Sequence, residues 1–586
     1  MGTDAGLCPE NWPANPEVVD NTFTRESIMH RSHFACAASF LFLASAAPVV
    51  AQVQGPSSSQ TPYLVAAPGS GVRITSIFTT GDSVNSAPDG TPYRMLGTPD
   101  GLGAFLDDDV DDELESDGQI PTGTFTLLMN HEFVAGAGTT LHAHGAVGGA
   151  FASQWSIDRQ TLQVGHGQDL IQQTYLWNPP TSAYALGTTG FARFCSSTLP
   201  QRSAFYDKAS KTGTKRRILM NGEENGALGR AFAHVVSGPN AGTSYELPRL
   251  GKLSFENAVP NPATGIKTLL AASDDFALPG GGELYMYLGT KQNSGTDIDK
   301  AGLTNGSLFG IAVNGIPDED RLAGIPSGSR FSMVNHGDVS HINGAELQAM
   351  DDATNVTKFL RAEDGNWDPR NPRDYYFATT DRYDQTRDTP PGATVGRSRL
   401  YRLRFDDLSN PAAGGTIDKL LDGTEGYQQL DNMTIDRYGH VLLEEDPGAV
   451  SYLAKIWQYD IASGGLKLLA QHDPARFLPG SADFLTIDEE ASGIIDASDI
   501  LGPGWFLLDV QAHYANGLEL VEGGQLLALY NPDSNPQFAG VAIPEPGSVV
   551  TLLTLAAACG PRRRRWTRVR GRQVSGHRRS SGGSCL

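Results

Sequence analysis

The chain has 586 residues, of which 67 are glycine and 35 proline, and its hydrophobic fraction of 39% suits a soluble protein with one large or two ordinary domains. Residues 52–543 carry 33 Lys and Arg against 60 Asp and Glu, a net charge of −27. A body this acidic repels phosphate backbones, which argues against nucleic acid as a partner, and the many glycines favour turns over long helices.

The N-terminal segment predicts export. Residues 29–51 have a basic start at Arg31, an apolar run over 34–47 and a small-residue cleavage pattern ending at Ala51, which together are typical of a secretory signal peptide. Residues 1–28 are polar and acidic, and we interpret them as an upstream extension before the true start at Met29. Residues 52–62 are rich in Ser, Gln and Pro and predict a flexible lead-in.

The region 63–543 is predicted to be all-β. Short apolar or alternating runs recur, each closed by Gly, Asn, Asp or Pro, as in Gly123–Asn130, Gly282–Thr290, Ser398–Asp407, Gly439–Asp446 and Gly524–Asn531. Strands followed by a polar turn with Asp are scattered over about four hundred residues, which indicates radially repeated blades. We therefore predict a β-propeller, with a large β-sandwich or two-sheet fold as the alternative.

Acidic residues stand at the ends of several predicted strands. The segment Arg217–Gly226, "RILMNGEENG", ends in adjacent glutamates, and similar pairs occur in "LLAASDDF", "FLRAEDGNWDP" and "VLLEEDPG". In a propeller the inner strand ends surround the axis, so these carboxylates would converge, and clustered carboxylates become favourable when they bind hard cations. Solvated turns are the alternative interpretation. The acidic stretch 105–118 lacks the ligand spacing of an EF-hand, so we predict a surface loop there.

Cys195 is the single cysteine of the expected mature body, because two of the other four lie in or before the leader and two lie in the tail. It therefore forms no disulfide within that body and is either buried or bound to a ligand.

At these residues the sequence resembles the PhoX-type alkaline phosphatase family. The resemblance spans about Tyr63–Tyr530 and rests on "NHEF", the lone cysteine, "NGEEN", "LSFEN" followed by "SDD", "LYMYLGTKQ", "RAEDGNWDP", "DNMTIDRYGHVLLEED" and "DVQAH". It implies a six-bladed propeller that carries Ca²⁺ and a pair of Fe³⁺ ions and hydrolyses phosphate monoesters. The implied partner is a phosphate-containing small-molecule substrate.

The family's functional residues transfer onto matching positions of this sequence. By resemblance, Cys195 is the thiolate that bridges iron, and Arg361 holds the substrate phosphate. The implied metal-binding carboxylates are Glu223 or Glu224, Glu256, Asp275 and Glu363, and motifs shared with the family also contain Glu132, Glu445 and Asp446.

The sequence departs from the family around its cysteine. The family has an Asn-Cys-Ala-Gly-Gly run there, whereas this chain has "ARFCSSTL". The family's phosphate-binding lysine shortly before the cysteine is absent, and Arg193 is the residue that could substitute for it. These departures keep open a non-catalytic, calcium-binding propeller of the cell surface or extracellular matrix. We interpret His131, His142 and His144 as loop histidines, because no zinc-protease motif accompanies them.

The C-terminal segment 544–565 resembles the PEP-CTERM sorting signal of Gram-negative bacteria. It runs from Pro544-Glu545-Pro546 through an apolar stretch at Val549–Cys559 to an arginine cluster at Arg562–Arg565. The resemblance implies the sorting machinery as a partner, transient anchoring in the inner membrane, and delivery to the periplasm, cell surface or extracellular matrix. Residues 566–586 form a basic tail to which we assign no function.

Overall fold

The computed structural model describes residues 52–86, 90–107, 123–276, 282–387 and 391–537, which belong to one compact unit, Val49–Ile543. The expected upstream extension, signal peptide, sorting signal and basic tail lie outside the described residues, as does most of the acidic stretch 105–118. Among the helices that the structure describes, none is long and apolar enough to cross a bilayer.

Six blades form the unit, and each contributes one innermost strand. The third and fourth blades belong to one ten-stranded sheet, which is continuous where β22 (Ser329–Gly337) pairs with β27 (Gly415–Leu421). The innermost strands are β6 (Pro99–Leu106), β12 (Phe194–Thr198), β18 (Phe255–Pro260), β24 (Ala362–Trp367), β28 (Leu430–Ile435) and β32 (Glu489–Asp496). They pack side by side in this order, and β32 packs in turn against β6. The ring closes, so the fold is the predicted six-bladed β-propeller and the sandwich alternative is wrong.

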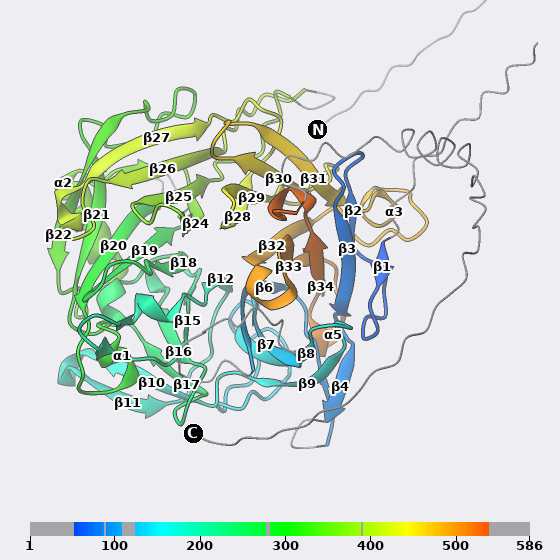
Figure 1. The fold of residues 1–586 in the computed structure, drawn as a ribbon, viewed down its shortest axis with the longest axis horizontal. Coiled ribbons are helices and arrows are strands. Elements are labelled where there is room, and N and C mark those ends of the chain that lie inside the picture. Colours follow the sequence, from blue (N-terminus) through cyan, green and yellow to red (C-terminus); the bar gives the residue numbers. More distant parts are fainter. Residues whose placement is uncertain (1–51, 87–89, 108–122, 277–281, 388–390, 538–586) are drawn as a thin grey trace, which may run out of the picture. The chain divides into compact units, whose positions relative to one another are not determined.

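The first three blades can be followed in Figure 1 from blue-cyan to green. The first blade continues outward from β6 through β7 (Thr124–His131), β8 (Phe151–Asp158) and β9 (Val164–Asp169). The second continues from β12 through β15 (Ile218–Glu223), β16 (Ala231–Val235), β17 (Thr243–Glu246), β10 (Gln173–Asn178) and β11 (Ala183–Gly187). The third continues from β18 through β19 (Lys267–Asp274), β20 (Gly282–Thr290), β21 (Ser307–Val313) and β22 (Ser329–Gly337).

Of the last three blades, the fifth and sixth include strands from the start of the described chain. The fourth blade runs outward from β24 through β25 (Asp374–Thr379), β26 (Arg399–Phe405) and β27 (Gly415–Leu421). The fifth adds β29 (His440–Glu445), β30 (Lys455–Asp460), β31 (Leu466–His472) and the early strand β2 (Leu64–Ala66) to β28. The sixth adds β33 (Trp505–Ala512), β34 (Gly523–Tyr530), β3 (Arg73–Thr79) and β1 (Val53–Gln54) to β32. Early strands thus complete the late blades and leave fewer free edges.

The hydrophobic core is divided among the blade interfaces. Each pair of neighbouring sheets encloses its own cluster of buried apolar side chains, because a blade is buried on both faces. Trp155 of the first blade, for example, packs edge-on against Phe78 of the sixth with 5.0 Å between ring centroids. Helices are few and short; the longest is α2 (Gly344–Thr354), which begins at an Asn343 capping box.

Candidate metal centre

The second residue of every innermost strand carries a potential metal ligand. These six residues are Asp100, Cys195, Glu256, Glu363, Asp431 and Glu490, and we call them the axial ring. Because the six strands begin at the same end of the propeller axis, equivalent positions in the strands become neighbours in space. We call this end of the axis the entry end.

Each innermost strand is irregular close to its ring residue. The pairing with the next strand shifts register just after the strand begins, for example between Phe255 and Ala258 in β18 and between Ala362 and Gly365 in β24. Comparable shifts occur in the other four innermost strands. A β-bulge leaves residues unpaired and re-aims their side chains, which releases Cys195, Glu256, Glu363 and Asp431 from the ordinary alternation of a strand. Asp100 and Glu490 keep regular partners, and the register shifts after them.

The ring residues gather into three groups with two additional carboxylates. In each group the potential ligand atoms lie within 4.8 Å of one another, and the groups are Asp100–Glu132–Cys195, Glu256–Glu363–Asp431 and Asp431–Asp446–Glu490. Glu132 directly follows β7 and Asp446 directly follows β29, which are the strands next to the innermost ones. Asp431 belongs to two groups and therefore links them.

Burial makes this concentration of acids costly without a cation. It raises the pKa of Asp100, Glu256 and Asp431 well above the ordinary range, and neighbouring carboxylates add to each shift. Burial and neighbouring carboxylates also raise the pKa of the Cys195 thiol. Burial, together with the charge of Asp446, raises the pKa of Glu490 to about 7. Either these groups take up protons or cations compensate their charge.

The donor set fits hard cations together with a transition metal. Glu256 Oε1 and Asp431 Oδ1 are buried and have no hydrogen-bond partner in the described structure. Glu363 Oε1 is also buried and lies 3.3 Å from Arg361 Nη2. Carboxylate oxygens are the ligands that Ca²⁺ prefers and also suit Fe³⁺, whereas a thiolate suits a transition metal. The residues present therefore fit the Ca²⁺ and Fe³⁺ that the sequence resemblance implies.

Two arginines border the ring on the solvent side. Arg361 directly precedes β24 and binds Asp275 through two parallel hydrogen bonds, Nε–Oδ1 at 2.6 Å and Nη2–Oδ2 at 2.7 Å. Arg193 directly precedes β12 and joins Glu132 (2.8 Å) to Glu224 (2.6 Å). Both arginines have left-handed backbones, with φ of 61° and 45°. Despite burial, the adjacent carboxylates raise the pKa of both guanidinium groups, so both stay charged.

Four of the sequence-predicted carboxylates lie outside the three groups: Glu223, Glu224, Asp275 and Glu445. Glu223 accepts two hydrogen bonds of 2.7 Å from Arg230. Glu445 accepts hydrogen bonds from the indole of Trp457 and the hydroxyl of Tyr452. These contacts direct Glu223 and Glu445 into the blades. Glu224 instead binds Arg193, and Asp275 binds Arg361, the two arginines that border the ring.

Three ring residues were missing from the sequence-based set. Asp100 in "TPDG" and Asp431 in "QLDNM" resemble ordinary turn residues. Glu490 directly follows Glu489, so the sequence does not show which of the two is a ligand. Each nevertheless occupies the same place relative to its strand start as Cys195 and Glu256 do. That shared position is the signal that could have identified them.

A second layer of polar contacts supports the ring. Gln511 donates from Nε2 to Asp100 at 3.0 Å and to Glu132 at 2.8 Å. Deeper along the axis, Asn432 donates to Ser196 at 2.8 Å, which ties the fifth blade to the second. Such cross-blade bonds fix the ligands before a cation arrives.

The loop interpretation is wrong for His131, which is the last residue of β7 and pairs with Phe151 of β8, whereas His142 and His144 lie in a loop. All three histidines have structural surroundings. His131 contacts Ser153 and the carbonyl of Gly97, and its ring stacks on Phe151 with 4.2 Å between centroids. His142 stacks on the same phenylalanine, and His144 packs on Phe191. Among the described residues, none of the three histidines belongs to a group of potential metal ligands.

The fold and the axial ring define an all-β propeller with a candidate metal centre at one end of its axis. No protein-family model matches the sequence, and no curated protein matches it either. Among solved structures, the chain is similar to Pseudomonas fluorescens PhoX in complex with vanadate, a transition state analogue: the TM-score is 0.53 and the identity 12%, over 79% of this chain and 96% of that one. At this identity the likeness shows a shared fold.

A second similarity, to a prolyl endopeptidase structure, has a TM-score of 0.24 and 9% identity over 75% of this chain and 51% of that one. It carries no argument about this protein.

Proposed function

We propose that the protein is a metal-dependent phosphoesterase that hydrolyses phosphate monoesters, in the manner of PhoX-type alkaline phosphatases. The observation that carries the proposal is the axial ring, with a potential metal ligand at the same position of six strands and Arg361 at its edge. In a body with a net charge of −27, an anionic substrate can bind only where cations and arginines reverse the local sign.

The proposed metal ligands combine the grouped side chains with residues that the resemblance implies. Cys195 with Asp100 and Glu132, and Glu256 with Glu363, would hold Fe³⁺, and the all-carboxylate group of Asp431, Asp446 and Glu490 suits Ca²⁺. Glu224 and Asp275 lie outside these groups and are proposed as ligands by the resemblance alone. When bound, such ions would polarise a phosphoryl oxygen and neutralise the charge that develops during transfer.

The chain's own residues would bind and orient the substrate. Arg361 presents two parallel donors, which bind the oxygens of Asp275 here and match the spacing of two phosphate oxygens. Its side chain is 27% exposed, so an entering phosphate can reach it. Arg193, whose side chain is 45% exposed, supplies a second guanidinium group at the ring and binds Glu224 at 2.6 Å.

Metal analysis of the protein, expressed from the full chain with export and purified without chelators, tests this proposal. We expect iron and calcium together, and phosphate release from an aryl phosphate that Cys195→Ser abolishes along with the bound iron. Calcium without iron and without phosphate release would instead support the non-catalytic propeller. We also propose that the protein acts outside the inner membrane, which fractionation of the native host would test.

A further inference from the structure

Arg361 has a backbone conformation that must be held in place. Its φ of 61° lies in the left-handed region, which is unfavourable for a residue with a Cβ atom. Such a conformation persists only where the surrounding contacts determine it. The contacts that hold this backbone therefore also set the direction of the guanidinium group.

Three hydrogen bonds from outside the strand fix the segment Leu360–Arg361. The N–H of Leu360 donates to Glu319 Oε2 at 2.9 Å, and its carbonyl accepts from the N–H of Asp381 at 2.9 Å. The carbonyl of Arg361 accepts from the N–H of Thr380 at 3.1 Å. Only the first of these bonds depends on a side chain, that of Glu319.

Glu319 is itself held by a fully buried ion pair. Its Oε1 accepts from Arg399 Nη1 at 2.8 Å and from the Tyr401 hydroxyl at 2.7 Å, and neither charged side chain is exposed to solvent. A buried ion pair adds little stability over apolar residues of similar volume, but it fixes geometry. Both carboxylate oxygens are in use as acceptors, one toward Arg399 and the other toward Leu360.

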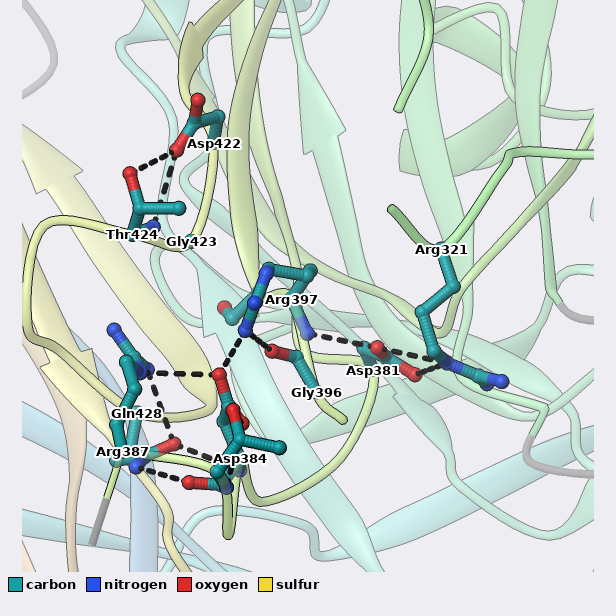
Figure 2. Close-up of polar contacts among 12 residues, drawn as sticks. Arg321, Asp381, Asp384, Arg387, Gly396, Arg397, Asp422, Gly423, Thr424 and Gln428 are labelled. Atoms are coloured by element: carbon teal, nitrogen blue, oxygen red, sulfur yellow. Dashed lines mark hydrogen bonds and ion pairs between the residues drawn. The ribbon is translucent and has the colours of Figure 1, made fainter. Parts of the chain in front are cut away.

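The same arginine joins Glu319 to the network drawn in Figure 2. Arg399 donates to the carbonyls of Arg321 and Arg397. Asp381 binds those two residues from the other side, accepting from Arg321 Nε at 2.9 Å and from the N–H of Arg397 at 2.8 Å. Glu319, Arg399 and Asp381, which all contact the segment Leu360–Arg361 or its neighbours, are therefore connected to one another through Arg321 and Arg397.

The network continues into the next blade. Asp384 binds Arg387 and Arg397, and its N–H donates to the amide oxygen of Gln428 at 3.0 Å. The N–H of Gln428 donates in turn to Glu445 at 2.7 Å, one residue before the proposed ligand Asp446. The backbone of Arg361, the proposed phosphate-binding residue, and the proposed metal group that contains Asp446 are thus anchored to the same network.

We propose that Glu319 is a positioning residue for Arg361. Its buried pair with Arg399 fixes the acceptor for the Leu360 N–H, holds Arg361 in its left-handed conformation, and so aims the guanidinium group at the entry end. This inference rests on the proposed function, in which Arg361 binds the phosphoryl group.

The test is equilibrium binding of inorganic phosphate to the metal-loaded protein, measured by titration calorimetry. In Glu319→Gln the amide offers one acceptor oxygen where the carboxylate offers two, so either Leu360 or Arg399 loses its partner. We expect Arg361→Ala to weaken phosphate binding by about 10- to 100-fold, the range for hydrogen bonds to charged groups. Glu319→Gln alone should weaken it by about tenfold through misplacement of the clamp.

The decisive measurement is the double variant. If Glu319 acts through Arg361, Glu319→Gln changes phosphate binding by less than about twofold in the Arg361→Ala background. The matched control is Arg330→Met, which removes an ion pair with Asp406 whose side chains are 46% and 48% exposed, and which should leave phosphate binding unchanged. Metal content and thermal unfolding, measured on every variant, separate a general structural defect from a local one.

Two results would overturn the inference while sparing the proposed function: an unchanged phosphate affinity in Glu319→Gln, or an equal loss in both backgrounds. An unchanged affinity in Arg361→Ala would overturn both, because the clamp itself would be absent. If Glu319→Gln does not fold, Tyr401→Phe serves instead. It removes one hydroxyl donor to Glu319 and should weaken phosphate binding in the same direction by about threefold, again only when Arg361 is present.

Discussion

The adjacent glutamates at the end of β15 are expected to have different tasks, which leads to a sharp prediction. Glu223 is 2% exposed and accepts hydrogen bonds from Arg230 and from the N–H of Ala192, within the second blade. Glu224 turns toward the ring and meets Arg193. Glu223→Gln should therefore destabilise the fold and spare the metals, whereas Glu224→Gln should lower the metal content.

The size of the first effect follows from the contacts. Breaking a buried ion pair costs about 3–5 kcal/mol, and since the Arg230 side chain is 19% exposed, we take the lower value of about 3 kcal/mol. Unfolding entropy of roughly 2.1 cal/mol/K per residue gives about 1 kcal/mol/K for a unit of about 490 residues, so the midpoint should fall by about 3 °C.

Calorimetric unfolding and metal analysis of the two variants, prepared side by side, check this reasoning. In Glu224→Gln we expect reduced iron or calcium, and a thermal midpoint that approaches that of the parent when both are measured in excess chelator. Loss of metal from Glu223→Gln, or full metal content in Glu224→Gln, would refute the assignment of tasks.

Three further predictions concern packing, pH and metal removal. Gly101→Ala would place a Cβ 2.3 Å from the N–H of Ser197 and should lower stability by about 1–3 kcal/mol, whereas Gly190→Ala, with no atom within 4 Å, should be neutral in the same denaturation experiment. Burial raises the pKa of Glu283 to about 8 from 4.5, so this residue makes stability fall as pH rises from about 4.5 to 8. The thermal midpoint of Glu283→Gln, measured at pH 5, 7 and 9, should accordingly rise relative to that of the parent as pH increases. A difference between the two midpoints that stays constant with pH would contradict this. A chelator should destabilise the protein measurably, because a cation at a hundredfold excess over its Kd contributes about 2.7 kcal/mol per site.

The local pattern of the sequence was sufficient for the strands and for two ring residues. Alternating runs closed by Gly, Asn and Asp predicted an all-β chain, and the closed ring of six blades confirms the propeller. Cys195 stood out as the lone cysteine and Glu363 as part of an acidic pair, whereas Glu256 was identified through the family resemblance. Asp100 and Asp431 did not stand out, because a single aspartate near a turn is common and its burial cannot be read from neighbouring residues.

The sequence by itself determined which residues alternate and where strands stop, since these depend on contacts between residues close in the chain. Side chains at adjacent strand positions face opposite ways, so the sequence favours one of Glu223 and Glu224 for the axis without saying which. Which of them reaches the axis was decided by the tertiary structure, through Arg230, which directly precedes β16, and Arg193, which directly precedes β12. The axial ring was decided in the same way, because it exists only when six strands far apart in the chain begin at one end of a common axis.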